Sequence, residues 1–254
     1  MKKTVKNLIT WSPSHLITSP KSAFTLAEVL ITLAIIGVVA AMTIPTLLQN
    51  FTNRVVETKL QKIYSLMNQV ITLSELDNGP KEFWPSSCNG EGNISCEDYY
   101  AKYIFPYIRT QKIEHADINS QGNVIINFAD GSLLIGKNTE DYFFYPNAKN
   151  YDKDNFLIMD ENQTDPQRPT VGITSFTFRF APQPNVWGSA NRLHNNRGFE
   201  AYMYGISELT KENLINPTND YACQENASIK HYCTALIKMN NWKIPKDYPF
   251  NVKN

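Results

Sequence analysis

The first strong pattern along the chain is an apolar run at residues 24–51, in which Glu28 is the only formally charged side chain. About 20 apolar residues are enough for a helix to cross the hydrocarbon core of a bilayer. The run therefore predicts a membrane-spanning helix and is longer than the minimum that spanning requires. A charge inside such a helix costs about 2.5–3.5 kcal/mol even on the most permissive scale, so Glu28 needs a partner or a function.

The helical pattern continues beyond this run. Apolar residues separated by polar ones recur at spacings of four and three, at Val56, Leu60, Ile63, Met67 and Val70. This spacing predicts an amphipathic continuation of the helix that packs against a sheet. The residues at 77–80, Asp-Asn-Gly-Pro, predict its end. Pro45 removes one backbone hydrogen bond and clashes with the preceding turn, so a kink is expected there.

Apolar runs and alternating patterns predict the sheet. Runs at 123–128 and 132–135 flank the turn-forming pair Asp130-Gly131 and predict a β-hairpin. Residues 155–160 and 173–180 are the next two predicted strands, joined by an acidic loop. A short helix is expected within 96–108, a loop at 181–198, and a terminus held on the domain at 242–249.

These elements predict an α+β fold with a long N-terminal helix packed on a small antiparallel sheet. The expected organisation is a leader at 1–23, a membrane or fibre-core helix at 24–50, its amphipathic continuation at 51–77, and an exported globular α+β domain at 78–254.

The distribution of charge indicates an orientation and excludes one class of partner. Four lysines and no acid precede the apolar run: Lys2, Lys3, Lys6 and Lys21. By the positive-inside rule this flank stays cytoplasmic and the large C-terminal part lies outside. The chain as a whole has no net formal charge. The part after residue 23 has a negative net charge, because these four lysines lie in the segment before it. That balance argues against nucleic-acid binding through a basic surface.

On pattern alone, three interpretations of the N-terminal segment compete. The first is a secretory signal peptide cut near the small residues at 39–41. The second is an uncleaved membrane anchor, and the third is a leader that is cut before the apolar helix. The signal-peptide interpretation requires an apolar core that is too long and places Glu28 inside the leader.

Residues 23–28, Ala-Phe-Thr-Leu-Ala-Glu, resemble the cleavage and methylation motif of the type IV prepilin family, usually Gly-Phe-Thr-Leu-any residue-Glu. In that family a membrane aspartyl peptidase cuts before the Phe and methylates the new amine, which implies processing between Ala23 and Phe24. Gly37 and Pro45, the expected kink positions, are the fourteenth and twenty-second residues of the resulting chain, where pilins commonly have Gly and Pro. Ala23 in place of Gly and the long leader are departures, so slower cleavage is expected.

The resemblance implies a lollipop-shaped pilin or pseudopilin. Such a protein is a structural subunit, not an enzyme, of a type II secretion or type IV pilus machine. It sits in the inner membrane with its domain in the periplasm or outside the cell, and it can be extracted into a fibre. The implied partners are other pilin or pseudopilin subunits, the prepilin peptidase and an inner-membrane assembly platform. No cofactor is expected.

Glu28 has two interpretations that do not exclude each other. The resemblance implies an assembly role, in which its carboxylate faces the N-terminal amine of a neighbouring subunit. From the residues alone, Thr25 to Glu28 form a T-x-x-E capping box at a helix start. The rival for the whole protein is a single-pass, membrane-anchored binding or adhesion protein.

The four cysteines form two local pairs, Cys88 with Cys96 and Cys223 with Cys233. In an exported domain such pairs predict disulfides. The sequence permits three pairings, and an anaerobic habitat would leave free thiols. A zinc site of Cys223, His231 and Cys233 is a further alternative.

Other chemistry is sparse. The sequence has no paired-histidine metal motif, nucleophile elbow, Walker loop or dinucleotide fingerprint. No metal site is expected beyond three candidate calcium ligands whose spacing does not fit an EF-hand loop: Asp160, Asn162 and Asp165.

Overall fold

The computed structural model describes residues 24–85, 88, 94–108, 112–118, 121–137, 139–152, 170–183 and 193–254. It divides into two compact units, residues 1–46 and 47–254. One helix, α1 (Leu26–Asn78), belongs to both, and Pro45 lies inside it without ending it. The described part of the first unit is the first stretch of α1 and the two residues before it. The kinks at Gly37 and Pro45 stay a prediction.

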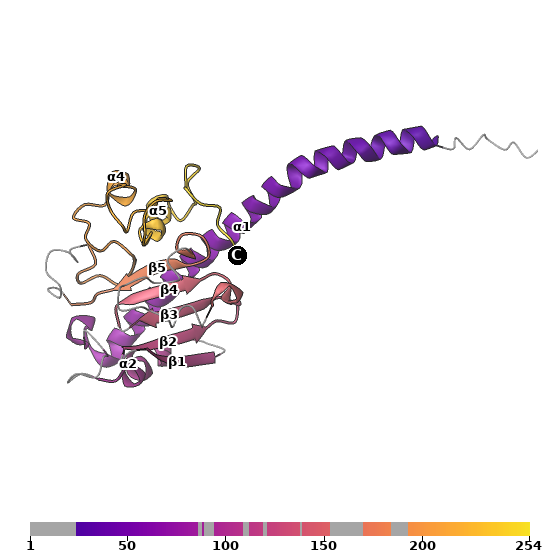
Figure 1. Cartoon of the computed structure of the whole chain (residues 1–254). Coiled ribbons are helices and arrows are strands. Elements are labelled where there is room, and N and C mark those ends of the chain that lie inside the picture. Colours follow the sequence, from indigo (N-terminus) through magenta and orange to yellow (C-terminus); the bar gives the residue numbers. More distant parts are fainter. Residues whose placement is uncertain are drawn as a thin grey trace, which may run out of the picture. The chain divides into compact units, whose positions relative to one another are not determined.

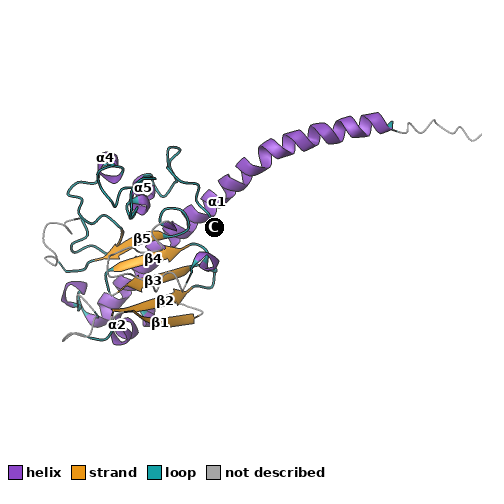
Figure 2. Ribbon diagram, viewed as in Figure 1, coloured by secondary structure: helices purple, strands orange, loops and turns teal. Residues whose placement is uncertain are grey.

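The described part of the second unit contains a six-stranded antiparallel sheet (Figures 1 and 2). Its strands are β1 (Lys112–Ile118), β2 (Gln121–Asn127), β3 (Leu133–Lys137), β4 (Asp141–Tyr145), β5 (Phe176–Phe180) and β6 (Phe199–Ala201). Each strand pairs with the next one along the chain, so β1 and β6 are the two edges of the sheet.

The predicted hairpin is present as β2 and β3. Asn127 pairs with Leu133, and Gly131 in the turn has a φ of 76°, which glycine adopts without strain. The strand predicted at 173–180 is β5, which begins later, at Phe176. The prediction missed β1, β4 and β6. The strand predicted at 155–160 lies outside the described residues.

The amphipathic part of α1 packs against one face of the sheet. Its apolar stripe is at most 2% exposed and consists of Val56, Leu60, Ile63, Met67 and Val70. The stripe shares one core cluster with residues of β2, β3 and β5 that include Val124, Ile126, Leu134, Phe176, Phe178 and Phe180. Residues that alternate with these along β2 and β3 form a separate cluster on the other face, which includes Ile125, Ile135 and, from β4, Phe143. Truncation of a stripe residue such as Leu60 to Ala is therefore expected to cost about 2–5 kcal/mol.

The C-terminal part covers the second face of β5. Thr177 donates its backbone N–H to Oγ1 of Thr234 at 2.9 Å and its hydroxyl to the carbonyl of His231 at 2.8 Å. Thr234 lies in α5 (Cys233–Met239), and α4 (Lys211–Leu214) precedes it. The closing segment is held on the domain as expected, because the ring of Trp242 lies 4.9 Å from that of Tyr64 in α1.

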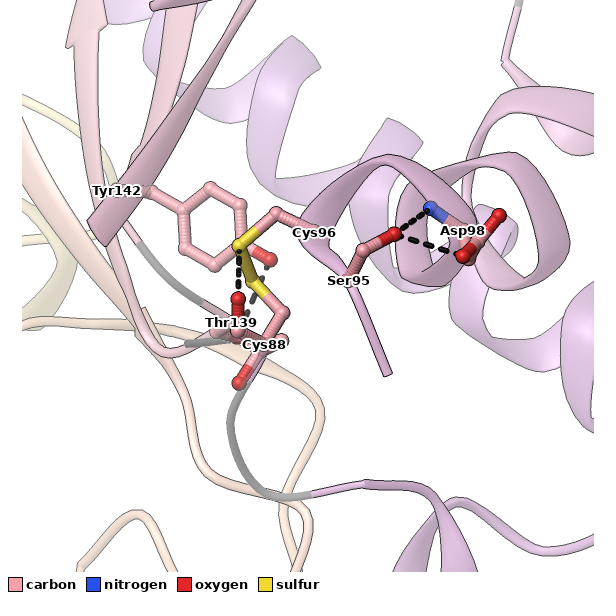
Figure 3. The surroundings of a disulfide bond; sticks show 6 residues. All are labelled: Cys88, Ser95, Cys96, Asp98, Thr139 and Tyr142. Atoms are coloured by element: carbon pink, nitrogen blue, oxygen red, sulfur yellow. Dashed lines mark hydrogen bonds between the residues drawn. A yellow bond between two sulfur atoms is a disulfide. The ribbon is translucent and has the colours of Figure 1, made fainter. Parts of the chain in front are cut away.

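The short helix expected within 96–108 is present as α2 (Cys96–Tyr103), followed by the 3-10 turn η2 (Phe105–Tyr107). Ser95 caps α2 by accepting the backbone N–H of Asp98 at 3.0 Å (Figure 3). Two further 3-10 turns are η1 (Lys81–Phe83), after α1, and η3 (Ala148–Asn150), after β4.

Candidate functional site

The start of α1 is closed by hydrogen bonds between Thr25 and Glu28. The Glu28 carboxylate accepts both the backbone N–H and the hydroxyl of Thr25, each at 2.8 Å. In return the Thr25 hydroxyl oxygen accepts the backbone N–H of Glu28 at 3.2 Å. This reciprocal arrangement is a capping box, which satisfies backbone donors that a helix start leaves free. Within the single chain, Glu28 therefore acts as part of a helix cap.

The residues of the proposed processing site lie directly before this cap. Phe24 is 82% exposed and precedes Thr25 without belonging to the helix. Ala23 lies outside the described residues. A cut before Phe24 would place a new amine four residues, about one helical turn, from Glu28.

The first part of α1 presents a continuous apolar surface. The exposed large apolar side chains along it range from 42% exposed at Val29 to 77% at Leu26, and they include Leu30, Ile31, Ile35, Ile36 and Met42. The helix is long and apolar enough to span a membrane, and its apolar window is not buried within the chain. Exposed apolar surface of this extent marks contact with a membrane or with other proteins.

Two hydroxyls within this surface donate hydrogen bonds to the helix's own backbone. Thr32 donates to the carbonyl of Val29 and Thr43 to that of Val39, each at 2.9 Å. These internal hydrogen bonds are the arrangement that a hydrocarbon environment requires of polar groups. Gly37 leaves a gap in the surface, because a Cβ added there would meet nothing within 4 Å.

The cysteines lie far from this helix start in the sequence. Disulfides join Cys88 to Cys96 and Cys223 to Cys233, which are the two local pairs. The second bond occupies two of the three ligands named for zinc. Among the described residues no group of three or more His, Cys, Asp or Glu could hold a metal. The calcium candidates Asp160, Asn162 and Asp165 lie outside the described residues.

Glu57 is a residue whose role the sequence did not indicate. It follows Val56 on the helix and is only 8% exposed. Its carboxylate accepts the backbone N–H of Ile244 at 2.9 Å and pairs with Lys243 at 2.8 Å. Glu57 thus fixes the C-terminal tail to α1. Because these partners are more than 180 residues away along the chain, no local pattern could have identified them.

Two family models match the chain. Residues 46–252 match a family of unknown function, DUF6613. The chain belongs to this family. Residues 18–44 match the prokaryotic N-terminal methylation motif, a segment that includes Phe24, Thr25 and Glu28. No curated protein and no solved structure matches the chain significantly.

The motif match and the fold agree with each other. The chain has a type IV prepilin-like N-terminus, followed by the long helix and antiparallel sheet expected of a pilin-type α+β protein. Proteins with this motif are structural components, and the exposed apolar helix suits a membrane-anchored protein.

Proposed function

We propose that the chain is a structural subunit, a pseudopilin or pilin-like protein, of a type II secretion or type IV pilus-like assembly. One observation carries this proposal. A single carboxylate, Glu28, stands at the start of the otherwise apolar and exposed first part of α1, within a segment that matches the methylation motif.

In the proposed topology, residues 1–23 are a cytoplasmic leader and 24–50 cross the inner membrane. Residues 51–77 continue the helix outside, where 78–254 form the exported domain. The basic leader supports this orientation through the positive-inside rule. The two disulfides support it as well, because such bonds persist in oxidising compartments and are rare in the cytoplasm.

Processing prepares the subunit for assembly. The prepilin peptidase cuts between Ala23 and Phe24 and methylates the new amine, which remains a cation when protonated. Glu28 of an incoming subunit then gives up the hydrogen bonds that it accepts from Thr25. In their place its carboxylate forms an ion pair with the N-terminal amine of a neighbour already in the fibre. A buried charge without a partner is expensive, so this pair fixes the axial register of adjacent helices. The apolar surfaces of the helices supply the adhesion.

The test separates the assembly role of Glu28 from its role as a helix cap. The variant Glu28→Ala removes the carboxylate. The variant Thr25→Val keeps Glu28 but removes the hydroxyl that donates a hydrogen bond to it in the isolated subunit. Both variants and the wild type are expressed in cells with the complete assembly machine. Cleavage is checked by N-terminal mass spectrometry, and incorporation by fractionation of sheared fibres and by crosslinking.

We expect Glu28→Ala to be inserted and cleaved but to enter fibres at least tenfold less than the wild type. Thr25→Val is expected to enter them at nearly the wild-type level. Equal incorporation of Glu28→Ala and wild type would leave Glu28 as a cap only. A cleavage-competent chain that stays monomeric and binds a specific ligand would favour the membrane-anchored binding protein instead.

A further inference from the structure

A cavity of 580 Å³ lies between the first polar turns of α1 and the C-terminal tail. The helix contributes residues between Gln49 and Glu57, and the tail contributes residues between Lys243 and Asn251. Figure 1 shows the C-terminus beside α1, and the Nε2 of Gln49 donates to the carbonyl of Val252 at 3.2 Å. The tail and the helix thus form one continuous wall around the cavity.

The wall of the cavity is held in place by the buried carboxylate of Glu57. The backbone N–H of Ile244 and the ammonium of Lys243 both bind this carboxylate, which is the acid in the lining. On the helix side, Gln49 also donates to the Asn53 side-chain oxygen at 2.8 Å. These contacts make the cavity a built feature of the fold.

The lining carries a surplus of positive charge. Its cations are Arg54, Lys243 and Lys246, and Lys243 is already paired with Glu57. No ion pair within the described part of the chain engages Arg54 or Lys246. The neighbouring carboxylate, Asp247, is held by Lys211 at 2.5 Å. Two cations are therefore available to an anion in the cavity.

The position of the cavity along α1 indicates where that anion comes from. At 1.5 Å per residue, Gln49 lies about 38 Å and Arg54 about 45 Å along the helix from Phe24. The hydrocarbon core of a bilayer is about 30 Å thick, and about 40–45 Å with both headgroup layers included. In the topology proposed above, the cavity therefore opens at the outer headgroup layer.

We propose that this cavity binds the phosphate-bearing headgroup of an anionic phospholipid in the outer leaflet. Arg54 and Lys246 bind the phosphate, for which the forked guanidinium of arginine is especially suited. Side-chain amides in the lining, such as Asn53 and Asn251, can bind headgroup hydroxyls, and Phe250 adds an apolar wall. The inference rests on the membrane orientation in the proposed function, but it assigns a ligand that assembly alone does not require.

The test uses the full chain purified in a non-ionic detergent and native mass spectrometry with equimolar phosphatidylglycerol and phosphatidylcholine. The variant Arg54→Gln/Lys246→Gln removes the two available cations. The matched control, Lys149→Gln/Arg197→Gln, removes two exposed cations that do not line the cavity. A third variant, Arg54→Lys/Lys246→Arg, keeps both charges. Competition with inorganic phosphate and with glycerol phosphate separates a free anion from a lipid.

We expect the wild type to retain phosphatidylglycerol at least fivefold more than phosphatidylcholine. This preference should fall below twofold in the double glutamine variant and persist in the control and the charge-keeping variant. Equal retention of the two lipids by the wild type, or an unchanged preference in the double glutamine variant, would overturn the inference. Complete displacement by millimolar inorganic phosphate would assign the site to a free anion and reject the lipid.

The binding assay and the fibre assay can fail independently of each other. Lipid retention is measured on isolated subunits, so a chain that never enters a fibre still yields a result. A chain that forms Glu28-dependent fibres without a lipid preference would refute the lipid site and leave the proposed function intact.

Discussion

The side-chain amide of Asn68 makes two hydrogen bonds with the main chain of Phe199. Its Nδ2 donates to the Phe199 carbonyl at 2.9 Å, and its Oδ1 accepts the Phe199 N–H at 3.0 Å. Phe199 begins β6, which is an edge of the sheet and only three residues long. The amide therefore replaces the neighbouring strand that an edge lacks. In this way α1 closes the sheet in addition to covering it.

Replacement of Asn68 by Leu should destabilise the domain by about 1–3 kcal/mol, because it leaves two main-chain groups of Phe199 without partners. Gly198→Ala should have a similar effect, since its Cβ would lie 2.0 Å from the Oδ1 of Asn68 and displace the amide. Because both changes break the same contact, their effects should not add. Chemical unfolding of the detergent-solubilised chain measures each variant and the double variant. Full additivity, or an Asn68→Leu variant as stable as the wild type, would contradict this account.

Processing should leave methylated Phe24 as the first residue of the mature protein. N-terminal mass spectrometry of membrane-extracted protein tests this directly, and Met1 or Met42 at the terminus would rule out cleavage before Phe24. The variant Ala23→Gly restores the residue that is usual in the motif. In a pulse–chase experiment it should be cleaved faster than the wild type.

If the domain is exported as proposed, the isolated protein should contain the bonds Cys88–Cys96 and Cys223–Cys233. Each closes a loop of about ten residues, for which the chain-entropy account gives about 3 kcal/mol of stabilisation. Non-reducing peptide mapping identifies the pairing. The paired variant Cys223→Ser/Cys233→Ser should lose stability of this size without losing membrane insertion. Four alkylatable thiols, or one equivalent of bound zinc, would defeat the prediction.

The stability of the domain should decrease below pH 6.5 because of His194. Burial is the main cause that lowers the pKa of this imidazole to about 3. The Ala201 carbonyl opposes the shift, and the positive charges of Arg179, Arg197 and Lys238 reinforce it. Its Nε2 accepts the backbone N–H of Met203 at 2.9 Å, which requires that nitrogen to be unprotonated. Since the pKa is about 3 when folded and near 6.5 when unfolded, the unfolded chain binds the proton first as pH falls. Stability is therefore lost between these two values, by at most about 1.4 kcal/mol per pH unit.

The variant His194→Gln keeps a side-chain acceptor for Met203 but does not titrate. Comparison of its unfolding free energy with that of the wild type at pH 4.5 to 7.5 isolates the histidine. Asp130 contributes little in that window: burial alone would raise its pKa, but hydrogen bonds from Lys62 and Ser132 lower the pKa to about 2. The same pH dependence in both proteins would exclude His194 as the cause.

The features that were predictable from the sequence are those with local patterns. The apolar run and the stripe from Val56 to Val70 indicated α1, and the Asp130-Gly131 pair indicated the hairpin of β2 and β3. β6 was missed because three residues carry no periodic signal and its edge is satisfied by Asn68, 131 residues away. The burial of Glu57 was not predictable from local pattern either, because its partners Lys243 and Ile244 lie in the C-terminal tail.

The candidate site was predictable to a similar extent. The motif located Phe24 and Glu28, and the T-x-x-E pattern described the hydrogen bonds with Thr25. The proposed contact between Glu28 and a second chain cannot be seen in the sequence or structure of one chain. The cationic cavity could not be predicted because Arg54 and Lys246, which line it together, are far apart in the sequence.

The attachment of the C-terminal tail to α1 also sets the timing of folding. Gln49 and Glu57 contact residues that are 203 and 187 positions later in the chain. These contacts cannot form until the last residues have been translated, and long-range contacts of this kind slow folding. Until then the carboxylate of Glu57 and one flank of α1 stay open to water. A chain truncated before Ile244 would remain in that state, so a protease could distinguish it from a completely folded chain.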